Sequence, residues 1–462
     1  MYVQPAQSIA IRYPSITRAH SPVFGIFAFF AAHVPLALLM KQFAAVGVLH
    51  AFATLAVGLW FTTFKSRPER VAYIAAYITG AEVLWRMTQV PVFWEFGKYA
   101  VAALLIVSMV VRRNLKAPIL PLVYFTLLLP SVALTTSSMD FQEARNDLSF
   151  NLSGPFALMI SAWFFSQIEL SREKILRLFL VFIGPVVGIV SIAAFSTLTA
   201  QELRFGGSNF VTSGGFGPNQ VSAVLGLGAL AAYLYAMDQR VAFNIRLLTL
   251  AILVVLATQS ALTLSRGGLY VAGASAMAAS LFLIQNTRSR MRFLVVAASL
   301  SFLAYYIVLP RLDALSKGGL KTRFESTKLT GRDLLAGAEL RAWKENPLLG
   351  LGPGRAESYR NRDRHSFASH TEYTRLLAEH GVLGFEALFI LLVMAVVNLR
   401  RPNTPDNRAL IVASLVWSLL FMAGNAMRLV AASFMFGLTF VNFLPAQGLA
   451  LNRWHRRIGV SR

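Results

Sequence analysis

Three side chains in this sequence have the chemistry to hold an anionic substrate and to move a proton: Arg204, Arg266 and His370. A guanidinium is a planar fork of donors that suits phosphate, and the glycines around Arg204 let backbone amides approach an anion closely. Arg266 lies between two apolar runs, where a charge is costly unless it faces a cavity or a partner. An imidazole accepts a proton near neutral pH, so His370 is the expected general base.

The arginines also have structural interpretations. Arg204 could bind lipid headgroups, and the same interpretation fits Arg428 better because its short turn lacks glycine-rich surroundings. Arg266 could pair with Glu82, although Glu82 could equally pair with Arg86 one turn later. These alternatives stay open at the level of the sequence.

The histidines leave a similar choice. His365 and His380 compete with His370 as proton acceptor. His370 and His380 are ten positions apart without further well-placed ligands, so no metal site is predicted. Other polar side chains of the same stretch are candidates for a supporting role: Arg355, Arg364, His365, Thr371 and Glu372.

The composition describes the scaffold that must position these residues. Of 462 residues, 56% are hydrophobic and 14% are charged, and apolar runs of about 17 to 25 residues recur, each long enough to cross a bilayer. The class is therefore an all-α polytopic membrane protein. The chain has no cysteine, which excludes disulfides, thiolate metal sites and iron–sulfur clusters. Its net charge of +22 would suggest nucleic acid in a soluble protein, but here it is expected to hold the cytoplasmic ends in place.

The apolar runs predict about fourteen spans, the first of which is too long and too closely followed by another to be a cleaved signal peptide. The predicted spans are 23–40, 43–64, 71–88, 97–111, 117–135, 148–168, 175–198, 219–237, 246–264, 268–285, 293–309, 381–399, 408–424 and 429–449.

Basic residues fill every second connection, which orients the chain with both termini in the cytoplasm. The predicted layout is a cytoplasmic tail over 1–22, eleven spans over 23–309, a periplasmic catalytic loop over 310–380, three spans over 381–449 and a basic cytoplasmic tail over 450–462. Arg204, Arg266, Arg428 and the long loop place positive charge on the opposite side, which the orientation rule does not explain. Chemistry is expected on that side.

The long loop is expected to contain short helices. Residues 331–344 place apolar side chains at near-helical spacing, which predicts a short amphipathic helix on the membrane surface that ends at Asn346-Pro347. A glycine-rich turn over 350–354 follows. A second helix is expected to begin at His370, with Ser369 as its N-cap, and to continue into the next span.

The three candidate residues come from separated segments but the same predicted side, and such a site suits a pyrophosphate substrate. Arginines would stabilise the charge on a departing pyrophosphate while a base deprotonates an attacking hydroxyl. The sequence contains no Walker A motif, no Rossmann glycine pattern and no DxD-like pair. Energy must therefore come from an already activated donor, or the protein is not an enzyme.

The chain resembles the O-antigen ligase and O-antigen polymerase family of bacterial envelope glycosyltransferases. The resemblance rests on three segments: Arg204 followed by Gly-Pro-Asn at 217–219, Ser-Arg-Gly-Gly at 265–268, and Ala-Trp-Lys-Glu-Asn-Pro-Leu-Leu-Gly-Leu-Gly-Pro-Gly at 342–354 through to His370 and Gly381-x-x-Gly384. It implies a GT-C-like membrane protein of about 12 to 14 spans. It also implies that Arg204 and Arg266 bind pyrophosphate and that His370 is the catalytic base.

The resemblance further implies a metal-independent glycosyltransferase of the bacterial inner membrane, without a cofactor, that takes a glycan from undecaprenyl pyrophosphate on the periplasmic face. The acceptor would be lipid A-core in a ligase or a second lipid-linked glycan in a polymerase, and a chain-length regulator is a candidate partner. Membrane lipid is the expected surrounding, and nucleic acid is not an expected partner. A lipid-linked glycan flippase, a protein O-oligosaccharyltransferase and a non-catalytic scaffold are the alternatives.

Overall fold

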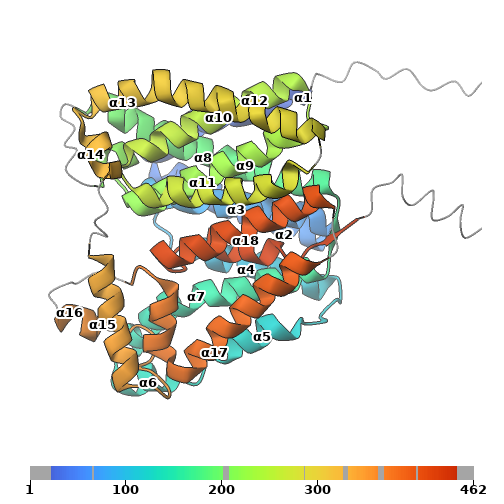
Figure 1. Ribbon diagram of the computed structural model, residues 1–462. Coiled ribbons are helices and arrows are strands. Elements are labelled where there is room, and N and C mark those ends of the chain that lie inside the picture. Colours follow the sequence, from blue (N-terminus) through green and yellow to red (C-terminus); the bar gives the residue numbers. More distant parts are fainter. Residues whose placement is uncertain are drawn as a thin grey trace, which may run out of the picture.

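The computed structural model describes residues 22–64, 67–200, 208–285, 287–325, 331–362, 369–401 and 404–444, and these are mostly helical (Figure 1). The helices are α1 (Pro22–Gln42), α2 (Ala44–Thr63), α3 (Pro68–Met87), α4 (Phe96–Val111), α5 (Ile119–Thr126), α6 (Val132–Ser138), α7 (Phe141–Ser166), α8 (Arg172–Thr199), α9 (Pro218–Met237), α10 (Phe243–Leu262), α11 (Arg266–Leu283), α12 (Thr287–Leu303), α13 (Leu309–Leu315), α14 (Gly319–Glu325), α15 (Arg332–Glu345), α16 (Glu357–Arg362), α17 (Glu372–Arg400), α18 (Pro405–Asn425) and α19 (Val430–Leu438). A 3₁₀ turn, η1 (Val211–Ser213), precedes α9, and a π-helical turn, η2 (Ala304–Val308), joins α12 to α13. The strands β1 (Glu169–Leu170) and β2 (Asn442–Phe443) pair in parallel.

The predicted class, an all-α polytopic membrane protein, is confirmed. Among the described residues, nine helical segments are long and apolar enough to cross a membrane. Their lengths of 20 to 29 residues match the roughly 20 residues that a bilayer core of about 30 Å requires. Many large apolar side chains remain exposed on the outermost helices, as expected where lipid rather than protein is the neighbour.

Two of the predicted spans are not single continuous helices. The segment 117–135 forms two short helices, α5 and α6, because Pro130 lies between them and has no N–H to continue a helix. The segment 429–449 contains only the nine residues of α19, about 13 Å of helix at about 1.5 Å per residue. Residues 445–449 lie outside the described part of the chain. The prediction of one unbroken span in each of these segments is wrong.

The centre of the bundle is built by close contacts between helices distant in sequence. The helix α9 packs against α10 and α11, α3 packs against α8, and α11 packs against α18. Small residues permit this approach: a Cβ added to Gly268 of α11 would lie 2.1 Å from the Ser222 carbonyl oxygen of α9. Two of the sequence segments singled out above, 217–219 and 265–268, therefore lie on adjacent helices.

The bundle has two distinct ends. The short helices α13 to α16 lie together at one end (Figure 1), which we call the loop end. The paired strands β1 and β2 lie at the opposite end, where Arg172 forms a 2.5 Å ion pair with Asp238. Connections predicted to be cytoplasmic meet at this strand end, and the connections with candidate residues meet at the loop end.

The helix α15 confirms the predicted short helix over 331–344, but its surroundings differ from the prediction. Leu335, Ala338 and Ala342 are buried, and α15 packs against α17. Its apolar face therefore contacts protein, and the predicted placement of that face on the membrane surface is wrong.

The start of α17 also differs from the prediction. The helix begins at Glu372 with Thr371 as N-cap, because the His370 carbonyl instead accepts the Ala426 N–H at 3.1 Å. A kink interrupts α17 at Gly381, whose φ of 60° is a conformation that glycine tolerates best. The Pro347 carbonyl accepts the N–H of the next residue, Val382, at 2.8 Å, so the glycine-rich segment packs into this kink.

Candidate active site

The turn between α18 and α19 carries Arg428 and is fixed by Arg86 of α3. The Arg86 guanidinium donates to the Arg428 carbonyl at 3.2 Å and to Gln220 Oε1 at 2.9 Å, and it pairs with Glu82 at 2.8 Å. The other Glu82 oxygen accepts the Val430 N–H at 2.8 Å. Of the two partners that the sequence allows for Glu82, the structure selects Arg86. This buried pair ties the turn to the start of α9.

The segment before α17 places His370 beside that turn. The His370 backbone carbonyl accepts the Ala426 N–H, and the Arg428 guanidinium donates to the carbonyl of Ser369. The imidazole is half-buried and hydrogen-bonds to the Gly424 backbone. Its other nitrogen, Nδ1, is buried and has no hydrogen-bond partner among the described residues. One ring nitrogen is thus held in place, and the other makes no hydrogen bond with the described residues that proton uptake would break.

The charges around His370 are mainly positive. Burial and the nearby guanidinium groups of Arg428 and Arg332 lower the pKa of His370 to about 4. The imidazole is therefore neutral at physiological pH. A neutral imidazole with an available nitrogen is the form that can accept a proton.

Several arginines form a group at the loop end, which we call the arginine cluster: Arg266, Arg323, Arg332, Arg360 and Arg428. Burial and the charges of Arg266 and Arg323 lower the pKa of Arg332. Burial and the charges of Arg360 and Arg332 lower the pKa of Arg428 to about 10. In both residues burial is the larger cause and like charge adds to it, and a bound anion would offset both effects, so the cluster is suited to a polyanionic ligand.

Arg428 is the residue that the sequence interpretation undervalued. A snorkelling role at the lipid surface was the favoured interpretation, but Arg428 is half-buried between His370 and the neighbouring arginines. Its turn lies far from the long loop in sequence and resembles any short connection. Hydrogen bonds such as those from Ala426 to His370 and from Arg428 to Ser369 bring the two segments together in the folded chain.

In a second charged group beside the cluster, one arginine has two carboxylate partners. Arg375 of α17 pairs with Glu372 at 2.5 Å and with Glu379 at 2.6 Å, and all three side chains are buried. Glu372 also accepts the Met427 N–H at 3.1 Å. This network joins α17 to the turn that carries Arg428, so Glu372 has a structural role.

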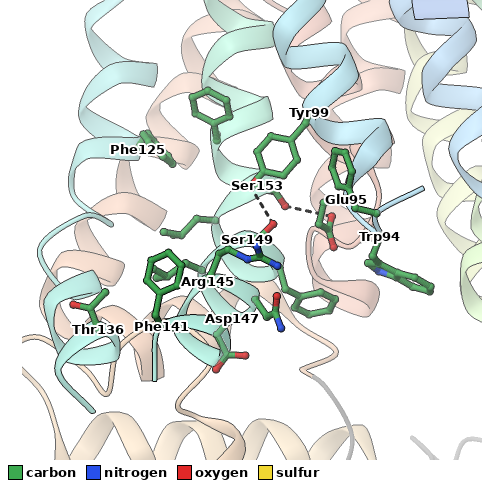
Figure 2. A pocket seen from close by; sticks show the side chains of 17 residues that line it. Trp94, Glu95, Tyr99, Phe125, Thr136, Phe141, Arg145, Asp147, Ser149 and Ser153 are labelled. Carbon is green, nitrogen blue, oxygen red and sulfur yellow. Dashed lines mark hydrogen bonds between the residues drawn. The ribbon is translucent and has the colours of Figure 1, made fainter. Parts of the chain in front are cut away.

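Two cavities lie next to this network. The smaller one, of about 280 Å³, is lined by Ser369, Arg360 and Arg428 on one side and by Asp147 and Phe150 of α7 on the other. The larger one, of about 1270 Å³, lies between α4, α5 and α7 and shares Asp147 and Phe150 with the smaller cavity (Figure 2).

The predicted site residues divide into three groups. Arg266 begins α11 and belongs to the arginine cluster with His370. Thr371 caps α17 through its hydroxyl, which accepts the Tyr373 N–H at 3.3 Å, and Arg355 lies near Asp147. Three other predicted residues, Arg204, Arg364 and His365, lie outside the described residues. The competing His380 is fully buried and bonds to the Ser131 hydroxyl at 2.5 Å, which gives it a structural role.

The sequence motifs at 217–219 and 265–268 position the site more than they form it. Ser265 donates to the Asn219 side chain at 2.7 Å, which joins the second motif to the first and fixes the start of α11 at Arg266. Arg323 donates to the Leu264 carbonyl at 3.2 Å, which adds a cation beside this junction.

Comparison with known proteins gives one family match. Residues 248–390 match the family model described as O-antigen ligase. The matched segment runs from α10 into α17 and includes Arg266 and His370. No curated protein matches the chain.

Proposed function

We propose that this protein transfers a glycan from undecaprenyl pyrophosphate to a sugar hydroxyl at the loop end of the bundle, because residues 248–390 match the O-antigen ligase family model. The loop end would face the periplasm of a bacterial inner membrane. The acceptor would be lipid A-core or a second lipid-linked glycan. The family match supports the class of reaction, and the donor, acceptor and sidedness are part of the proposal.

In the proposed reaction, His370 removes the proton from the acceptor hydroxyl. The hydroxyl oxygen then bonds to the anomeric carbon of the donor sugar, and the bond from that carbon to the pyrophosphate oxygen breaks. The leaving pyrophosphate keeps the electron pair and gains negative charge, which arginines such as Arg266 and Arg428 stabilise. Arg204 is proposed to assist from the connection before α9.

The observation that carries this proposal is the position of His370 within the arginine cluster. Burial and the neighbouring positive charge keep the imidazole neutral, so it is ready to accept a proton before the substrate binds. The same charge attracts a pyrophosphate. The arginine cluster around His370 therefore meets two requirements of the transfer: a neutral base for the acceptor hydroxyl and a binding site for the donor's anionic pyrophosphate. A metal ion is not required in this scheme.

The test is a gene deletion in the source strain, complemented with wild type or with His370→Ala, with surface polysaccharides resolved by gel. The deletion should abolish the glycan pattern and His370→Ala should fail to restore it while remaining in the membrane at wild-type level. Single repeats on lipid A-core would identify a polymerase, and long chains left on undecaprenyl pyrophosphate would identify a ligase. An unchanged pattern in the His370→Ala strain would contradict the proposal.

A further inference from the structure

The largest cavity described above is an open groove between α4, α5 and α7, and none of the proposed chemistry uses it. Its volume of about 1270 Å³ exceeds the roughly 300–1,000 Å³ of a typical small-molecule site. Aromatic side chains line much of it, among them Trp94, Tyr99, Phe125 and Phe141 (Figure 2). A groove of this size suits an extended ligand rather than a compact one.

The polar groups of the groove are fixed by the protein. The Ser153 hydroxyl donates to Glu95 at 3.3 Å, and the Tyr99 hydroxyl and the Ser149 hydroxyl lie 3.1 Å apart (Figure 2). Glu95 also pairs with the buried Lys98 at 2.6 Å. Flat aromatic faces beside preset hydroxyl, amide and carboxylate groups can stack on sugar rings and hydrogen-bond their hydroxyls.

The groove lies beside a second cavity that reaches the neighbours of His370. It shares Asp147 and Phe150 with the smaller cavity, and that cavity is bounded by Ser369 and Arg428 next to His370. Arg266 and Arg323 line neither cavity and interact with Arg332 on another side of the cluster. The order in space is therefore groove, smaller cavity, His370 and then the remaining arginines.

This order provides different sides of His370 for the acceptor and for the pyrophosphate of the donor. In a direct displacement, the attacking hydroxyl and the departing pyrophosphate lie on opposite sides of the anomeric carbon. The smaller cavity is lined by the carboxylates of Asp147, Glu357 and Glu372 and by an equal number of guanidinium groups, so its lining has no net charge. Beyond His370, Arg332, Arg323 and Arg266 add positive charge, which favours the pyrophosphate on that side. Sugar hydroxyls are uncharged and donate readily to carboxylates. The smaller cavity therefore suits the acceptor better than the donor's pyrophosphate.

We propose that the groove between α4, α5 and α7 binds the glycan of a lipid-carried acceptor and delivers its terminal hydroxyl through the smaller cavity to His370. The inference rests on the proposed transfer reaction and names the acceptor's route within it. The apolar wall near Phe125 and Phe156 would contact the acceptor's lipid portion, and the polar end near Asp147 would contact its sugars.

The test fills the groove with Ser149→Trp and uses Ser301→Trp as the matched control, because Ser301 is exposed on α12, away from the groove. Two quantities are measured: glycan transfer in the complemented deletion strain, and binding of undecaprenyl pyrophosphate to purified protein in phospholipid nanodiscs. We expect Ser149→Trp to reduce transfer at least tenfold while undecaprenyl pyrophosphate binds as it does to wild type. Ser301→Trp should change neither quantity.

Two outcomes would overturn the inference. Undiminished transfer by Ser149→Trp would show that the groove has no part in the reaction, and a tenfold loss of undecaprenyl pyrophosphate binding would assign the groove to the donor's prenyl chain. If Ser149→Trp is lost from the membrane, Phe141→Ala replaces it, because Phe141 is 82% exposed and lines the groove. The proposed function fails separately, if wild type does not bind undecaprenyl pyrophosphate and His370→Ala retains full transfer.

Discussion

Two groups of charge lie side by side at the loop end, and they differ in how their charges are balanced. In the network on α17, the buried Arg375 has two carboxylate partners, Glu372 and Glu379. In the arginine cluster, Arg428 has Arg360, Arg332 and Arg375 among its charged neighbours and Glu339 as the opposing one. In the first arrangement the cation is matched by carboxylates of the protein itself, which holds α17 in place. The second is dominated by like charges and gains most from a bound anion.

The largest effect expected from this contrast is the loss of Arg375. Arg375→Ala leaves two buried carboxylates without their cation, which costs about 3–5 kcal/mol in the free energy of unfolding. Thermal unfolding in detergent should show a large decrease in melting temperature. The double variant with Arg375→Met and Glu372→Gln should recover part of it. Equal melting temperatures for Arg375→Ala and wild type would show that the charge network on α17 does not stabilise the fold and so does not differ from the arginine cluster in this respect.

The next effect concerns activity without a comparable loss of stability. Arg428→Ala should reduce glycan transfer by about 10²- to 10³-fold, the usual consequence of removing one donor to a developing anion. Its melting temperature should change little, because removing one of several like charges relieves repulsion. Arg177→Ala at the strand end serves as control, since the Arg177–Glu173 pair is exposed. A melting temperature as low as that of Arg375→Ala would instead make Arg428 a structural residue.

A smaller effect should appear in the pH dependence of transfer. The reaction needs neutral His370, whose pKa is lowered to about 4 in the free protein. The acid limb of kcat/KM, which reports the free enzyme, should therefore lie near that pH. A bound pyrophosphate adds negative charge beside the imidazole and raises its pKa, so the acid limb of kcat should lie at higher pH.

Arg332→Gln sharpens the same test. Removing one of the cations that lower the pKa of His370 should move the acid limb of kcat/KM to higher pH. The variant keeps an uncharged, hydrogen-bonding side chain, shorter than that of arginine, at the start of α15. An acid limb that stays in place would show that the arginine cluster does not control the protonation of His370.

The smallest effect is expected at Thr371, which caps α17. Thr371→Ala should lower the free energy of unfolding by about 1 kcal/mol and reduce transfer less than tenfold, whereas Thr371→Ser should resemble wild type because its hydroxyl can still accept the Tyr373 N–H. A loss of transfer as large as that of Arg428→Ala would assign Thr371 a direct contact with substrate.

Hydropathy predicts most of the fold because a bilayer demands long apolar helices. It fails where the chain breaks within an apolar run, at Pro130 and after α19, since hydropathy alone does not distinguish a span from a shorter buried segment. It also misplaces α15. The apolar side chains of a surface helix look alike in sequence whether they contact lipid or another helix, and only the packing against α17 decides between these.

Chemistry and spacing predict part of the site. Arg266 and His370 were identified by residue type and by segment, and the structure brings both to the arginine cluster. Arg428, Arg332 and Arg360 could not be selected, because their importance depends on contacts between segments far apart in the chain. From the sequence, Glu82 and Arg86 are expected only to pair with each other one helical turn apart. The structure shows that they also hydrogen-bond to the backbone of the turn that carries Arg428.

The most direct test separates binding from proton transfer at His370. Purified wild type and His370→Ala, in phospholipid nanodiscs, are titrated with undecaprenyl pyrophosphate and then assayed for a single turnover of glycan transfer. We predict similar binding for both proteins and a loss of transfer of at least about 10²-fold in His370→Ala, the typical minimum contribution of a general base. Transfer by His370→Ala at the wild-type rate would contradict this prediction.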